Sequence, residues 1–184
     1  RSLLGTLSQG KKILNVFSYT GGFSIYALKA GATEVHSLDS SQRALEVCEK
    51  NVRLNGLSED CHKSIRADAL EYLKTDTLGE YDIVVLDPPA FAKRASARHA
   101  AIQGYKRINL RALQGMKSGS LLFTFSCSQA VDDAMFTNTI VAAAIQAGRT
   151  VRILHRLHQP PDHPVNAFHP EGSYLKGLVV RVDK

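Results

Sequence analysis

The chain has 184 residues, of which 44% are hydrophobic and 22% are charged, which is an ordinary globular composition. This length is enough for one well-buried domain, and no apolar run reaches the roughly eighteen residues that a membrane-spanning helix needs. The chain shows no charged-then-apolar leader, so we expect a single cytoplasmic domain over residues 1–184. The three cysteines have no disulfide or metal-ligand spacing, and we expect reduced thiols.

Positive charge is concentrated in one segment. Between Pro88 and Val131 there are seven Lys or Arg residues and no Asp or Glu, whereas the rest of the chain is nearly neutral. The formal net charge of +6 therefore comes from this segment. Such a concentration favours a phosphate-bearing partner, although a basic face that is merely solvated explains it equally well.

Short apolar runs alternate with helical patterns along the whole chain. The predicted strands cover 12–17, 34–38, 81–86, 120–125, 151–154 and 178–182, with a further short strand just before Asp68. The predicted helices cover 22–30, 42–55, 69–74, 104–116 and 132–147. The segments 91–103 and 159–174 lack a regular pattern and are predicted to be functional loops. This alternation predicts an α/β fold, with a mainly parallel sheet that helices cover on both faces.

The first predicted strand leads into a glycine-containing turn at 18–22 and then into a helix. Glycines allow a close backbone approach to a ligand, and a helix amino terminus presents free amides. Asp39 ends the next strand eighteen residues after Gly21, close to the spacing of about 20 at which an acid binds a ribose diol in dinucleotide folds. Asp68 is predicted to contact an adenine amine, to cap the following helix, or both. The turn lacks the third-glycine pattern of a nicotinamide site, and S-adenosylmethionine fits better.

Two motifs carry the predicted chemistry. The Asp-Pro-Pro sequence at 87–89 ends an apolar strand, and its prolines form a rigid platform for a planar base. Cys127 follows the next apolar strand and is flanked by serines. Addition of its thiolate to C6 of a pyrimidine would activate C5 for methylation, after which a base that the sequence does not identify removes the C5 proton. The alternative for Cys127 is a small buried hydrophobic residue, which is the interpretation for Cys48.

Five sets of residues make the chain similar to a known family. Residues 15–23, 87–91, 104–106, 124–128, and 162–165 with 170–172 resemble the bacterial 23S ribosomal RNA large-subunit methyltransferase I family. The resemblance covers nearly the whole chain. It implies a Rossmann-like class I S-adenosylmethionine-dependent methyltransferase fold, in which a mainly parallel seven-stranded sheet has an antiparallel last strand. It also implies C5-methylation of a cytosine in 23S ribosomal RNA, with Cys127 as the nucleophile.

The chain departs from this family in two respects. Family members begin with an RNA-binding PUA domain, so the resemblance implies that this chain is a fragment or a minimal relative. The family often has Lys directly after Asp-Pro-Pro, where this chain has Ala90.

The predicted site has three parts. Catalytic roles are assigned to Cys127 and Asp87. Cofactor binding is assigned to the turn, to three acids and to their neighbours: Ser18, Tyr19, Thr20, Gly21, Gly22, Phe23, Asp39, Ser40, Asp68, Ala69 and Asp87. Substrate binding is assigned to Pro88, Pro89, Phe91, Lys93, Arg94, Arg98, Lys106, Arg107, His163 and Glu171. Ribosomal RNA is the expected partner, neither a membrane nor a metal is expected, and a homodimer is compatible with the sequence.

Other functions remain open at this stage. Asp-Pro-Pro followed by an aromatic residue also resembles amino methyltransferases, which act on adenine N6 or on protein and need no cysteine. A guanine methyltransferase of the same fold is a further alternative, although it lacks the Ser-Cys-Ser motif. From a different class, a catalytically silent RNA-binding module would use the basic segment without binding a cofactor.

Overall fold

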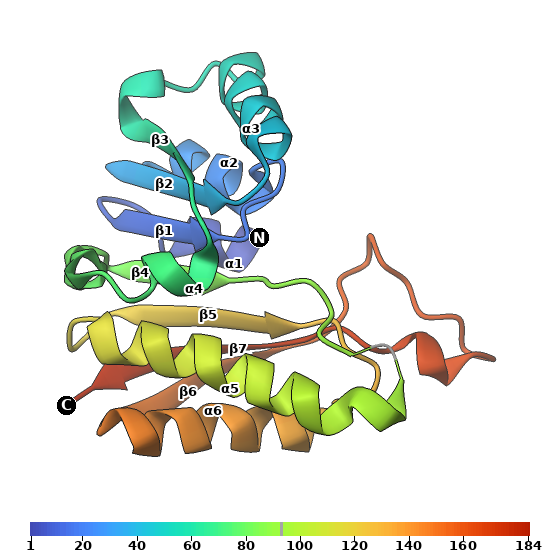
Figure 1. Ribbon diagram of the computed structural model, residues 1–184. Coiled ribbons are helices and arrows are strands. Elements are labelled where there is room, and N and C mark those ends of the chain that lie inside the picture. The colour runs from blue at the N-terminus through green and yellow to red at the C-terminus, as the bar shows by residue number, and fades with distance from the viewer. Residues whose placement is uncertain (93) are drawn as a thin grey trace.

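One mixed sheet organises the computed structural model, which describes residues 1–92 and 94–184 (Figure 1). The sheet has seven strands in the order β3-β2-β1-β4-β5-β7-β6. The strands are β1 (Lys12–Val16), β2 (Glu34–Asp39), β3 (His62–Arg66), β4 (Ile83–Leu86), β5 (Leu121–Ser126), β6 (Thr150–Leu157) and β7 (Lys176–Asp183). The pairs from β3 to β5 are parallel, whereas β7 runs antiparallel to β5 and β6. The predicted α/β fold with an antiparallel last strand is confirmed.

The helices follow the strands in alternation and are bounded by recognisable local signals. They are α1 (Ser2–Thr6), α2 (Gly22–Lys29), α3 (Gln42–Leu54), α4 (Ala69–Tyr72), α5 (Arg98–Gly115) and α6 (Asp133–Ala147). Short 3-10 turns lie at Glu59–Cys61, Asp76–Glu80, Ala95–Ala97 and Pro170–Gly172. Side chains of Ser41, Asp68 and Asp132 accept backbone N–H groups at the starts of α3, α4 and α6.

Alternate residues of the central strands face opposite layers of the core. Leu14 and Val84 belong to the cluster that includes side chains of α4, α5 and α6. Ile13 and Ile83 belong to the cluster that includes side chains of α1, α2 and α3. Since successive strand side chains point to opposite faces, near-continuous apolar strands bury both faces at once. The central strands are therefore held between two helical layers, which fixes where their ends lie.

Helix α5 is longer than its sequence pattern predicts. It begins at Arg98, whereas the prediction placed its start at 104 and left 98–103 in a loop. The helix has no side-chain N-cap, which removes the usual start signal. Its first turns are anchored instead by burial of Ala101. Smaller differences affect α4, which ends at Tyr72, and β6, which extends to Leu157 because it pairs with β7 along its length.

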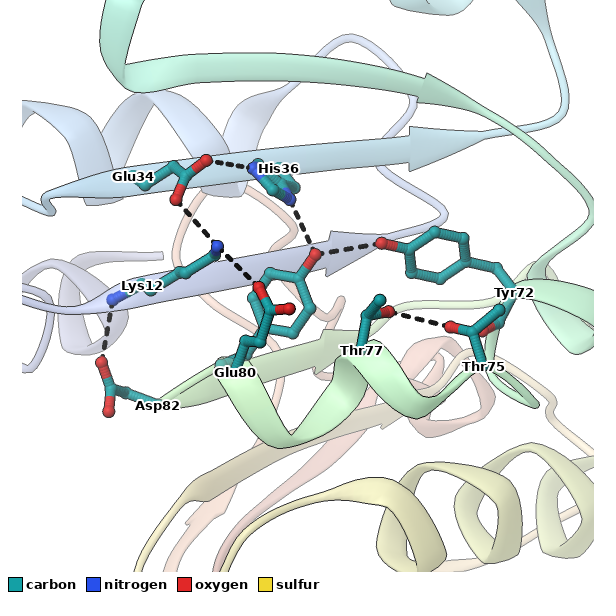
Figure 2. Close-up of polar contacts among 9 residues, drawn as sticks. Lys12, Glu34, His36, Tyr72, Thr75, Thr77, Glu80 and Asp82 are labelled. Carbon is teal, nitrogen blue, oxygen red and sulfur yellow. Dashed lines mark hydrogen bonds and ion pairs between the residues drawn. The ribbon is translucent and has the colours of Figure 1, made fainter.

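A polar network joins the strands at their amino-terminal ends (Figure 2). Lys12 Nζ lies 2.9 Å from carboxylate oxygens of both Glu34 and Glu80. The His36 ring lies 2.6 Å from Glu34 through Nε2 and 2.7 Å from the Tyr81 hydroxyl through Nδ1. These contacts tie β1 and β2 to the segment that enters β4. The network is a structural connection at the edge opposite the predicted site.

The carboxyl ends of the parallel strands meet at the other edge of the sheet. The loop that joins β6 to β7 projects from this same edge (Figure 1). Crevices at such edges are where open α/β sheets place their ligands. Among the described residues, no helix is both long and apolar enough to cross a bilayer.

Candidate functional site

The loop after β1 is fastened to the end of β2. The Ser18 amide donates to the Leu38 carbonyl at 3.0 Å, and the Tyr19 amide donates to the Asp39 carboxylate at 2.9 Å. A second Asp39 oxygen accepts the Ser41 amide at 2.9 Å. Asp39 therefore holds the loop in place while its half-buried carboxylate stays at the sheet edge.

Gly21 makes a backbone turn that no other residue makes without strain. Its φ of 85° lies in the left-handed region, and it forms the N-cap of α2. A Cβ at this position would overlap the Cys48 sulfur and lie 3.3 Å from the Cys48 Cβ. Asn51, one turn further along α3, donates to the Thr20 carbonyl at 2.9 Å. Side chains of α3 thus support the loop from beneath. In this position the loop leaves the first backbone amides of α2 without partners inside the helix.

The remaining acids of the predicted cofactor site lie at neighbouring strand ends. The Ala67 amide, just after β3, donates to the Asp39 carbonyl at 3.2 Å, which brings the β3 loop beside the β2 loop. Asp68 accepts the Glu71 amide at 3.0 Å, so the predicted capping role is confirmed. Asp68 and Ser40 are exposed, whereas Ala69 is buried at the start of α4. An adenine contact by Asp68 stays a prediction.

The Asp-Pro-Pro segment leaves β4 beside the same loop. The Asp87 amide lies 3.5 Å from the Val16 carbonyl, at the point where β1 ends. Pro88 is buried and Pro89 is exposed. Solvent reaches Asp87, yet desolvation by the surrounding protein raises the pKa of its carboxyl group, and the Arg1 charge opposes this shift.

Cys127 and Pro88 lie next to each other, as the two motifs predict. The Cys127 Sγ lies 3.9 Å from the Pro88 carbonyl oxygen, and the cysteine is half-buried. Burial raises the pKa of the Cys127 thiol, and the charge of Asp87 raises it further. By contrast, Cys48 is fully buried among α3 side chains, as predicted, and contacts Ser37 and His62.

Ser128, the residue after Cys127, has a structural role. Its hydroxyl oxygen accepts the Ala92 amide at 3.2 Å and lies 2.9 Å from the Tyr105 hydroxyl of α5. Its own amide donates to the Ser126 hydroxyl at 3.3 Å. One buried serine thereby connects the Cys127 turn to α5 and to the segment after Asp-Pro-Pro.

Phe91 packs against α5. Its ring centroid lies 4.7 Å from that of Tyr105, and a Cβ at Gly104 would lie 3.0 Å from the Phe91 ring. Phe91 is half-buried, so this contact fixes the segment on the helix. Stacking of Phe91 on a base stays a prediction.

The predicted basic residues lie along the start and middle of α5 and just before it. Arg94, Arg98 and Arg107 are exposed, and Lys106 is half-buried. The Arg98 Nε donates to the Ala130 carbonyl at 2.8 Å, which connects the first turn of α5 to the segment after Cys127. Lys93 lies outside the described residues.

His163 and Glu171 lie in the exposed loop between β6 and β7. His163 lies 3.9 Å from its neighbour Asp162, and Glu171 lies 3.1 Å from His169. These pairs are local, and the loop projects from the site edge of the sheet (Figure 1). A role of either residue in binding a base stays a prediction.

Three contributors were missed by the sequence reasoning. Arg1 lies against Gly22, where a Cβ would be 3.3 Å from its Nε, and its guanidinium reaches within 3.8 Å of Asp162. Asn51 supports the loop after β1, and the buried Lys176 of β7 donates to the Ser128 carbonyl at 3.0 Å. No local signal marked Lys176, because it lies before the predicted strand 178–182, which itself contains the charged Arg181.

A separate surface cavity has no link to these motifs. It is lined by Glu49, Val52, Glu59, His62 and Ser64, from α3, β3 and the turn between them. These residues lie away from Cys127, and we assign no chemistry to them.

Comparison with known families agrees with this geometry. The profile of a family described as S-adenosylmethionine-dependent methyltransferase matches residues 1–181. The chain is 43% identical over 183 residues to ribosomal RNA large subunit methyltransferase I of Aeromonas hydrophila, covering 98% of this chain and 46% of that protein. The protein of the same name from Escherichia coli O139:H28 is 43% identical over 176 residues, covering 95% of this chain and 44% of the relative. The predicted resemblance is confirmed, and the chain spans just under half the length of these relatives.

Solved structures share the fold. The structure of SMU.776 in complex with SAH superposes with a TM-score of 0.83 at 24% identity, covering 98% of this chain and 47% of that one. Trm5b from Pyrococcus abyssi superposes with a TM-score of 0.68 at 17% identity, covering 99% of this chain and 47% of that one. At these identities the likeness concerns the fold alone.

Proposed function

Because the chain belongs to the S-adenosylmethionine-dependent methyltransferase family, we propose that it methylates C5 of a cytosine in 23S ribosomal RNA through a covalent bond to Cys127. The observation that carries this proposal is the 3.9 Å approach of the Cys127 sulfur to the Pro88 carbonyl. It joins a thiol to the base platform at the carboxyl edge of the sheet. The ribosomal substrate is carried over from the names of the relatives.

The residues at the strand ends fit S-adenosylmethionine. The Ser18 hydroxyl is buried and has no hydrogen-bond partner within the described part of the chain, so it is free to meet a ligand. The turn at Gly21 presents the first amides of α2 to a carboxylate, and Asp39 offers acceptor oxygens to a ribose diol. Ser40, Asp68 and Ala69 border the adenine end in this assignment, and Tyr19, Thr20, Gly22, Phe23 and Asp87 border the methionine end. When bound, S-adenosylmethionine supplies an electrophilic methyl group.

Cys127 acts on the cytosine ring. Its thiolate adds to C6, which forms an S–C6 bond and moves electron density to C5. C5 would then displace the methyl group from the sulfonium, so the C5–methyl bond forms while the methyl–sulfur bond breaks and its electron pair stays on the donor's sulfur. A base removes the C5 proton, the C5=C6 double bond re-forms, and the S–C6 electron pair returns to the Cys127 sulfur as the thiolate leaves. Ring aromaticity is restored, and Cys127 is ready for another cycle.

Asp87 lies at the end of β4, where its carboxyl group would hydrogen-bond to the edge of the cytosine ring. Desolvation raises the pKa of this carboxyl group, and a protonated carboxyl would be the donor to the ring N3. A neutral Asp87 also removes the negative charge that raises the pKa of the Cys127 thiol. Binding of a base against Pro88 and Pro89 would therefore promote both the acid and the nucleophile.

The RNA would follow the basic surface of α5. Arg94, Arg98, Lys106 and Arg107 lie on or just before this helix, whose first turn is joined to the Cys127 segment. Basic side chains on such a surface bind RNA phosphates whatever the base sequence is. The target cytosine would enter the site from a loop or by flipping out of its stack.

RNA that contains 5-fluorocytosine tests the covalent step directly, because fluorine at C5 cannot leave as a proton does. We expect a denaturant-stable adduct that maps to Cys127 in the presence of S-adenosylmethionine and disappears in Cys127→Ala. Cys61→Ala is the matched control, since Cys61 is also half-buried but belongs to the turn before β3. Methyl transfer to ordinary RNA that survives Cys127→Ala, without an adduct, would instead identify an amino methyltransferase. RNA binding without any cofactor binding would identify a silent binding module.

A further inference from the structure

A buried lysine lies next to the turn that carries Cys127. Lys176 pairs with Ser126 across the antiparallel β5–β7 ladder and is only 6% exposed. Its ammonium nitrogen donates to the Ser128 carbonyl at 3.0 Å and to the Tyr174 carbonyl at 2.8 Å. Lysine is rarely buried unless its charge is compensated, and neither of these partners carries a full charge. The proposed reaction does not yet account for this cost.

We propose that Lys176 is a positioning residue for Cys127: its ammonium group holds the Ser-Cys-Ser turn against β7 and supplies the positive charge that stabilises the Cys127 thiolate. The inference deepens the proposed function and rests on Cys127 being its nucleophile. Two N–H groups of the ammonium bond to carbonyls, which fixes the nitrogen beside the turn.

The charges around the two groups support this pairing. Burial raises the pKa of the Cys127 thiol and Asp87 raises it further, while the charge of Lys176 acts in the opposite direction. Burial lowers the pKa of Lys176, and Asp133, Cys127 and Asp132 oppose that shift. The positive charge of Lys176 therefore interacts both with the Cys127 thiol and with the two aspartates at the start of α6, Asp132 and Asp133.

Other neighbours do not replace this cation. The His158 ring lies 3.9 Å from Asp133, at the start of α6, and the Arg98 guanidinium donates to the Ala130 carbonyl. The Tyr105 hydroxyl from α5 contacts the Ser128 hydroxyl and carries no charge. Lys176 is thus the buried cation that the described structure connects directly to the Cys127 turn.

The cation acts at both ends of the catalytic cycle. The thiol loses its proton to solvent or to a base, and Lys176 keeps its own protons throughout. Once the S–C6 bond forms, the negative charge leaves sulfur, and it returns beside the same ammonium group when the thiolate is expelled. Lys176 therefore lowers the energy of the thiolate both as nucleophile and as leaving group.

The test measures thiol reactivity and needs no RNA. The full protein is treated with iodoacetamide over a range of pH, and the alkylation rate of each cysteine is followed by peptide mass spectrometry. Lys176→Gln removes the charge and keeps a hydrogen-bond donor, Lys176→Met replaces the buried side chain by an apolar one of similar length, and Lys176→Arg keeps the charge. Cys61 is the internal reference in every sample.

In either neutral variant we expect the Cys127 rate at pH 7 to fall about tenfold, the change that one unit of thiol pKa produces. The rate at high pH should stay unchanged, and Lys176→Arg should restore most of the rate at pH 7. The Cys61 profile should be the same in all samples.

An unchanged Cys127 profile in a folded neutral variant overturns the inference, and so does an equal loss in Lys176→Arg and Lys176→Gln, which would indicate packing rather than charge. Thermal melting identifies the folded variants, and Lys176→Met provides a second neutral form in case the buried amide of Lys176→Gln prevents folding. If the profile shifts as expected but fluorocytosine RNA forms no adduct, the proposed function fails while the lysine–cysteine coupling stands.

Discussion

Substitution of Gly21 by Ala tests whether α3 determines the shape of the loop after β1, where S-adenosylmethionine is proposed to bind. The left-handed backbone at this position costs a non-glycine residue about 1–2 kcal/mol. The new methyl group would also overlap the buried Cys48 sulfur, and overpacking of this kind costs about 1–3 kcal/mol. We therefore expect Gly21→Ala to lower the free energy of unfolding by about 2–5 kcal/mol, measured by urea denaturation. S-adenosylmethionine affinity, measured by calorimetry, should fall because the loop must move.

Two further variants separate the causes. Gly31 has a similar φ of 83°, but the nearest atom to its Cβ would be Gln9 Cγ at 3.8 Å, so Gly31→Ala should cost only the backbone strain and leave cofactor affinity unchanged. Cys48→Ala removes the overlapping sulfur. The loss in free energy of unfolding of the double variant G21A/C48A should therefore be smaller than the sum of the two single losses, by about 1 kcal/mol or more. Equal costs for the two glycine variants, or strict additivity with Cys48→Ala, would refute the steric reasoning.

Three other predictions concern the loop, the acid and the RNA surface. Asn51→Ala removes the hydrogen bond to the loop and should weaken S-adenosylmethionine binding about tenfold in calorimetry, with a stability loss near 1 kcal/mol; unchanged affinity would show that the loop holds its shape alone. Asp87→Asn removes a charge that raises the pKa of the Cys127 thiol, so more thiolate forms at neutral pH. Alkylation of Cys127 should then be faster at pH 7. An unaltered pH profile of alkylation would contradict the electrostatic coupling of Asp87 to Cys127. Arg107→Glu should weaken RNA binding and reduce its salt dependence, as measured by fluorescence anisotropy, whereas the equally exposed Lys50→Glu on α3 should not; equal effects would mean that α5 is not the RNA surface.

The general architecture follows from periodicity that is visible in the chain. Apolar runs such as Ile83–Leu86 are buried on both faces, and amphipathic helices such as α3 separate them. The starts of α3 and α6 were predictable because Ser41 and Asp132 cap them locally. The start of α5 at Arg98 was not, because tertiary burial rather than a capping residue stabilises its first turns.

The site divides in the same way. The glycine turn, Asp39, Asp87 and Cys127 were recognisable because each directly follows an apolar strand, and parallel strands place their carboxyl ends at one edge. The approach of Cys127 to Pro88 joins residues 39 positions apart, and the bond from Lys176 to Ser128 joins residues 48 positions apart. Ser128 and Lys176 have no local pattern that announces their partners.

The sequence by itself determined the alternation of strands and helices and the strand ends that carry reactive side chains, because these depend on hydrophobic spacing and on neighbours along the chain. Only the tertiary structure decided that Cys48 lies beneath Gly21, that Ser128 connects the Cys127 turn to α5, and that a buried ammonium bonds to the carbonyl of the residue after Cys127. Those contacts depend on how the strands are ordered and on which side chains fill the space between layers. Burial then determines the cost of each charge, which is why the pKa of the Cys127 thiol depends on residues far from it in the chain.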